Sequence, residues 1–122
     1  MGDRMVVGFQ ANKAAAPVWL YSHWGGYSRE EDLAKALEAA KPRWSDDAYA
    51  TRIAISQIVG DEWDSELGFG ITAGERSFCL PDYDDVYLVD WSRQVVVRQT
   101  LEGSDIEEFG FAEFIQLAKE AV

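Results

Sequence analysis

Hydrophobic and polar positions follow two different periods along this chain. Short apolar runs, rich in β-branched and aromatic residues and broken by glycine or polar clusters, indicate strands. Five segments show this pattern: residues 5–10, 18–24, 67–72, 86–91 and 95–100. The last two are separated by a short polar turn, which is typical of a β-hairpin.

Three further segments repeat apolar residues every three or four positions, which predicts helices. Ser28 and Glu31 form a capping box before the first helix, and Pro42 ends it. Acidic residues in a first turn predict a second helix over residues 46–59, which we expect to be the more buried of the two. A third helix is predicted over residues 111–121, after an acidic linker at 102–108.

The predicted element order is β-β-α-α-β-β-β-α. Hairpins predominate, and no strand–helix–strand alternation supports a parallel sheet. We therefore expect an α+β fold in which an antiparallel sheet of about five strands carries three helices mainly on one face. The 122 residues contain no repeat or linker and are expected to form a single domain, 1–122.

Cysteine usage and hydropathy limit the class of protein. Cys79 is the only cysteine, so no intramolecular disulfide can form, and it cannot complete a zinc site with a single histidine. The first residues lack the apolar region of a signal peptide, and no apolar run is long enough to span a membrane. These features predict a cytoplasmic protein with no cofactor and no bound metal.

The charge is distributed unevenly. Residues 1–60 hold seven acidic and seven basic residues, whereas residues 61–122 hold fifteen acidic and four basic residues, so the net charge of −11 lies in the second half. Nucleic-acid phosphates need basic partners, which argues against direct nucleic-acid binding. The charge fits either solubility or a protein partner with a basic surface. Five tryptophans leave a homodimer open.

The most suggestive motif lies where the second strand should turn into the first helix. His23 and Trp24 precede Gly25 and Gly26 there. A helix start attracts anions, glycines admit a ligand close to the backbone, and histidine titrates near neutral pH, so this turn could bind an anion or nucleotide. Alternatively, the glycines only permit a tight turn and His23 is structural.

Arg52 is a second candidate. It shares a helical face with Ala48, Ile55 and Val59, which predicts a partly buried guanidinium. Such a group needs a carboxylate, for which Asp90 is one candidate, or a bound anion.

Two acidic clusters are candidates for binding a partner. Neither has the spacing of a calcium loop, and either cluster could instead be a solvated rim. The clusters consist of Asp61, Glu62, Asp64 and Glu66, and of Asp82, Asp84 and Asp85. No nucleophile elbow or dinucleotide fingerprint is present, and Cys79 has no base beside it, so the sequence favours a non-enzymatic function.

Several segments of the chain match one known pattern. They are Gly2-Asp3-Arg4, VWLYSHWGG at 18–26, Arg43, Trp44, Tyr49, Arg52, Gly68-Phe69-Gly70-Ile71 and the final hairpin. On these residues the chain resembles an uncharacterised family of small proteins from actinobacteria and from their phages and prophages. The resemblance covers most of the chain, although only the HWGG core is distinctive, and Ser22 and the acidic second half depart from the family pattern.

The family has no established activity, so the resemblance implies a context and no catalytic residue. It implies a phage or prophage accessory protein acting in the host cytoplasm. The leading hypothesis is a non-enzymatic protein that binds a host protein through an acidic surface in its C-terminal half. The alternative is a small-ligand binding protein or minor hydrolase centred on the HWGG turn and Arg52.

Overall fold

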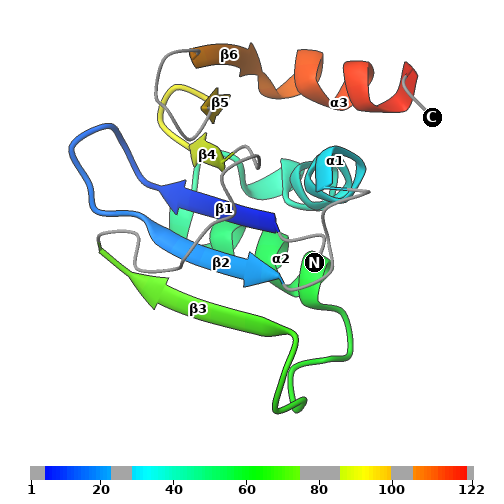
Figure 1. The fold of residues 1–122 in the computed structure, drawn as a ribbon. Coiled ribbons are helices and arrows are strands. Elements are labelled where there is room, and N and C mark those ends of the chain that lie inside the picture. Colours follow the sequence, from blue (N-terminus) through cyan, green and yellow to red (C-terminus); the bar gives the residue numbers. More distant parts are fainter. Residues whose placement is uncertain (1–4, 23–28, 75–85, 100–105, 121–122) are drawn as a thin grey trace.

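A computed structural model describes residues 5–22, 29–74, 86–99 and 106–120 of the chain. They form a six-stranded sheet with three α-helices and one short 3-10 helix, η1 (Figure 1). The α+β class is thereby confirmed. In chain order the elements are β1 (Met5–Gln10), β2 (Val18–Ser22), α1 (Arg29–Ala39), η1 (Lys41–Arg43), α2 (Asp47–Val59), β3 (Phe69–Ala73), β4 (Val86–Asp90), β5 (Val95–Gln99), β6 (Ile106–Gly110) and α3 (Phe111–Glu120).

The sheet is mixed, and the prediction of a purely antiparallel sheet is wrong. The strand order is β3-β2-β1-β4-β5-β6, and every neighbouring pair is antiparallel except β1 and β4, which run parallel. Strand β4 follows β3 in the chain but lies beside β1, and it runs in the same direction as β3. Local hairpin signals could not reveal this pairing, because its strands lie far apart in the sequence.

A sixth strand, β6, replaces part of the predicted acidic linker. Two glutamates lower the strand propensity of this segment, but neighbouring arginines on the sheet offset their charge. Glu107 lies opposite Arg98 in the pairing with β5, and Glu108 receives two hydrogen bonds from Arg93. Cross-strand ion pairs therefore stabilise a strand that the local sequence does not favour.

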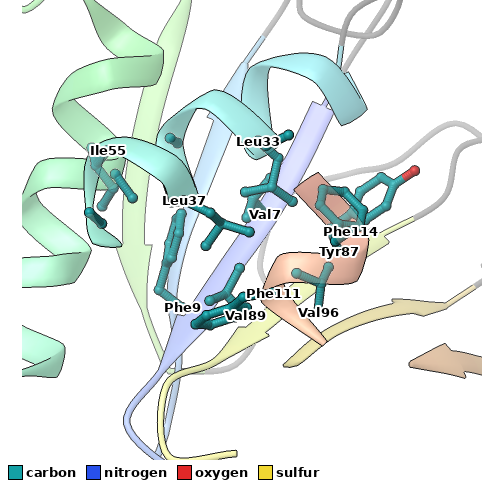
Figure 2. Packing of buried hydrophobic residues seen from close by; sticks show 14 of the residues in the cluster. Val7, Phe9, Leu33, Leu37, Ile55, Tyr87, Val89, Val96, Phe111 and Phe114 are labelled. Atoms are coloured by element: carbon teal, nitrogen blue, oxygen red, sulfur yellow. The ribbon is translucent and has the colours of Figure 1, made fainter. Parts of the chain in front are cut away.

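The hydrophobic core lies between the sheet and the helices. Leu33 and Leu37 of α1 pack over Val7 and Phe9 of β1, and α1 is flanked by α2 and α3 (Figure 2). Every residue of β1 is buried, as expected of a central strand covered on both faces. The predicted stripe of α3 is also buried, at Phe111, Phe114, Ile115 and Ala118.

Helix α2 is less buried than predicted. Asp46 is its N-cap and accepts a hydrogen bond from the backbone of Tyr49, as the first-turn acids indicated. Only one stripe is buried, however: Ala50, Ala54, Ile55 and Val59. Tyr49 is exposed, because α2 flanks α1 at the side of the helical layer rather than at its centre.

The opposite face of the sheet holds a smaller apolar cluster around Trp19. Its ring lies across Gly8, where an added Cβ would come within 2.6 Å of the indole. The indole N–H donates to the carbonyl of Gly74 at 2.9 Å, and the Gly74 amide donates to Pro17 at the same distance. These two bonds fasten the end of β3 to β2.

Candidate functional site

The HWGG turn lies outside the described residues. Strand β2 ends at Ser22 and α1 begins at Arg29, so His23, Trp24, Gly25 and Gly26 occupy the connection between them. The capping box at Ser28 falls in the same segment. A ligand site at this turn therefore stays a prediction.

Arg52 is exposed, and the prediction that it is partly buried is wrong. Its proposed mate, Asp90, is fully buried and pairs with Arg93 at 3.1 Å. The reason is topological: Asp90 belongs to the sheet face away from the helices, so α2 cannot reach it. Ala48, one turn earlier on the same side of α2, is exposed as well.

One predicted acidic cluster is described and the other is not. Asp61, Glu62, Asp64 and Glu66 are all exposed in the connection between α2 and β3, which we call the acidic connection (residues 60–68). The residues of the second cluster, Asp82, Asp84 and Asp85, lie outside the described part of the chain.

The acidic connection has a definite backbone geometry. It begins at Gly60, whose positive φ of 65° ends α2, and the amide of Glu62 donates to the carbonyl of Val59 at 3.3 Å. The Ser65 amide and hydroxyl donate to the carbonyl and to Oε1 of Glu62, at 3.1 and 2.8 Å. These bonds fix the orientation of the Glu62 carboxylate.

Apolar side chains lie exposed among these acids. Trp63 is 52% exposed, Leu67 73% and Ile71, on the adjoining strand β3, 49%. A hollow of about 150 Å³ lies between the connection and β3. Its lining combines apolar and polar groups: Val59, Trp63, Phe69, Gly70 and Ile71 with Glu62 and Ser65. The site thus offers an aromatic ring, an apolar floor and a carboxylate.

The acids of β6 differ from those of the acidic connection because they are paired. Glu107 bonds Arg98, and Glu108 accepts two bonds of 3.2 Å from Arg93. Burial by itself lowers the pKa of Arg98, but the charge of Glu107 and the nearby phenol of Tyr87 outweigh it, so the net pKa is raised. The described carboxylates of the acidic connection and of β6 therefore lie at different places, because β3 and β6 are opposite edges of the described sheet.

Asp90 holds the β4–β5 turn and, through Arg93, is linked to Glu108 of β6. Its oxygens accept hydrogen bonds from the amides of Ser92 and Arg93, the Ser92 hydroxyl and the Arg93 guanidinium, at 2.9–3.2 Å. Burial alone raises the pKa of Asp90. These hydrogen bonds and the Arg93 charge lower it by more, so the net pKa lies below its ordinary value. These contacts satisfy the buried carboxylate, and its role is structural.

Two hollows near α3 are alternative sites. One, of about 190 Å³, has Glu30, Tyr87 and Arg98 at its polar end. The Tyr87 hydroxyl donates to Glu30 at 2.6 Å, and Arg98 lies 3.7 Å from the same oxygen, so these groups satisfy one another. The other, of about 250 Å³, runs between α1 and α3, and its rim lysines pair with Glu31 and Glu38.

Within the described residues, no three histidine, cysteine or acidic side chains gather as a metal site would require. No described helix has the length and apolar character needed to cross a membrane. No protein-family model, curated protein or solved structure matches this chain. The resemblance to the phage and prophage family therefore stays a prediction.

Sequence analysis identified the acids of the connection but missed the apolar groups beside them. The signal was present, since Trp63 stands among four acids in a segment with no apolar periodicity. An aromatic residue there has no core to join, which marks it as exposed. The exposure of Ile71 could not be predicted from the sequence, because it follows from the position of β3 at the edge of the described sheet.

Proposed function

We propose that this chain is a non-enzymatic accessory protein that binds a host protein through the acidic connection. The partner is expected to present a basic surface there. The phage or prophage setting rests on the sequence resemblance alone. The binding role rests on the exposed groups of the second half.

The observation that carries the proposal is the pairing state of the carboxylates. The side chains of Asp61, Asp64 and Glu66 form no ion pair or hydrogen bond within the described part of the chain, and the Glu62 carboxylate is bonded there only to Ser65. Such a group of unneutralised charges attracts basic surfaces and raises their association rate.

Exposed apolar groups add a second reason. Tryptophan is enriched at the centres of protein interfaces, where it contributes a large contact area, and charged residues commonly form the rim. Trp63 and Leu67 lie among the acids in this arrangement. Trp63 also lines one hollow with Ile71, and exposed apolar groups that lie together mark an interaction site, whereas single ones do not.

A matched pair of charge variants tests the proposal. Glu62→Gln with Asp64→Asn removes two charges from the connection, and Glu113→Gln with Glu120→Gln removes two from α3. Each protein is used to capture partners from an actinobacterial lysate, and the captured protein is purified and titrated by calorimetry. We expect the first variant to bind about tenfold more weakly.

The control variant should bind as the wild type does, and raised salt should release the complex, because exposed charge contacts are screened. Equal affinity of both variants would overturn the acidic connection as the binding site. Failure of the wild-type protein to retain any partner that salt releases would overturn the proposed function.

A further inference from the structure

We infer that the partner binds as an extended, lysine-containing segment that adds to the edge of β3 that pairs with no described strand, and that it places a lysine side chain between Trp63 and Glu62. This inference rests on the proposed function and specifies its binding mode. It joins two features that lie side by side: the outer edge of β3 and the hollow beside it.

Strand β3 is an edge of the described sheet, paired on one side with β2. Its five residues, FGITA, carry no charge and no proline. Proteins usually protect edge strands with charged residues, proline, bulges or a covering element, because an unprotected edge pairs with other chains. Binding by strand addition uses such an edge, and its affinity comes from main-chain hydrogen bonds.

The edge is also held in an extended conformation. All five residues of β3 are in register with β2, and Trp19 and Pro17 fasten its end through Gly74. An incoming segment would therefore meet a pre-formed template, which lowers the entropy lost on binding.

The size of the adjoining hollow favours one side chain over a free small molecule. Its volume is about 150 Å³. Small-molecule sites typically measure about 300–1,000 Å³. Side chains of an added strand point alternately to the two sheet faces, so every second one would be directed toward the face that carries this hollow.

The lining of the hollow matches lysine. Val59 and Phe69 offer an apolar surface for the methylene stem, and Trp63 offers an aromatic face to the ammonium group. Glu62 Oε1 accepts from Ser65, and Oε2 has no partner among the described residues. That oxygen can accept a hydrogen bond from the ammonium group while Oε1 keeps its bond from Ser65.

Charge decides between a basic partner and a second copy of this chain. Two copies joined at β3 would bring two chains together that each carry a net charge of −11. Like charges held that close oppose association. A basic segment instead gains from the same carboxylates, so the edge accepts a basic chain and disfavours its own.

A set of short labelled peptides tests this mode. The probe alternates lysine and threonine and is long enough to pair with β3. One comparison peptide replaces lysine with glutamate, one replaces lysine with arginine, and a third replaces threonine with proline, which keeps the charge but cannot pair as a strand. Affinity is measured by fluorescence anisotropy, and amide exchange is followed by NMR.

We expect the lysine–threonine peptide to bind most tightly and to slow exchange of those amides of residues 70–72 that point away from β2. Trp63→Ala should weaken its binding about tenfold, since the cation–π and packing contacts are lost. Tyr49→Ala is the matched control: Tyr49 is an aromatic residue with the same 52% exposure, on α2, and its loss should leave the affinity unchanged.

The outcomes separate this inference from the proposed function. Equal binding of the proline peptide would overturn strand addition while leaving the acidic connection as a charge-led site. Equal or tighter binding of the arginine peptide would overturn the lysine assignment. If no basic peptide binds although the purified host partner does, this mode is wrong and the proposed function stands.

Discussion

The two edges of the described sheet differ in whether the acidic side chains near them have basic partners. At β6, Glu107 and Glu108 are bonded to Arg98 and Arg93, and α3 follows the strand directly. At β3, the strand has no charged residue, and the acids of the adjoining connection have no basic partner within the described chain.

This contrast separates charges that hold the fold together from charges available to another molecule. The acids of β6 are bonded within the sheet, so removing them should cost stability. The acids beside β3 have no basic partner among the described residues, so removing them should cost binding. Four expected results on stability test the contrast, in order of decreasing size.

The largest effect is expected for Asp90→Ala, at the turn that leads to the β6 edge. It removes the acceptor for two backbone amides, the Ser92 hydroxyl and Arg93, and should cost about 3 kcal/mol of unfolding free energy, since hydrogen bonds to charged groups contribute strongly. Urea denaturation measures it. Asp90→Asn keeps one acceptor oxygen and should lose less; equal losses would contradict this account.

Truncation of one aromatic residue at each edge should give the next largest difference. Phe109 of β6 packs against the core, with its ring 6.0 Å from that of Phe114. Phe109→Ala should cost about 2 kcal/mol, less than a fully buried phenylalanine. Trp63→Ala at the β3 side should change stability by no more than about 0.5 kcal/mol. A comparable loss for Trp63 would show that it supports the fold.

The pH dependence of stability should reflect Asp90. Its folded-state pKa lies below the unfolded value of about 3.9, so its contribution is present at higher pH and is lost as pH falls from that value through the folded-state pKa. The stability difference between the wild type and Asp90→Asn should therefore shrink in acid. A constant difference in urea midpoint across that range would contradict the lowered pKa.

The smallest effect should come from neutralising acids in pairs. Glu107→Gln with Glu108→Gln removes two half-exposed ion pairs and should cost up to about 1 kcal/mol, less at high salt. Asp61→Asn with Asp64→Asn should leave stability unchanged or slightly higher, because it lowers self-repulsion. Thermal unfolding at two salt concentrations distinguishes them, and equal destabilisation would remove the contrast.

Much of the fold could be predicted from the sequence, because the apolar positions of these segments are the ones that the structure buries. The stripes of α1 and α3 were predicted from apolar spacing, and the β4–β5 hairpin from two β-branched runs around a polar turn. The errors have one cause. The parallel β1–β4 pair, strand β6 and the exposure of Arg52 all depend on groups distant in sequence, which no local period encodes.

The candidate site shows the same division. Its acids and Trp63 were visible as residue types in the sequence, but their relation to β3 was not. Trp63, Ile71 and the hollow became part of one surface only because the fold brings Phe69 and Ile71 of β3 to the same hollow as Val59 at the end of α2.

By itself, the sequence determined the α+β class, the helices that cover the sheet and the concentration of negative charge in the second half. These follow from side-chain periodicity and composition, which act locally. Tertiary structure decided which strands lie at the edges and which carboxylates have basic partners. Both depend on pairing between segments distant along the chain, where the free energy is gained only once the whole sheet has formed.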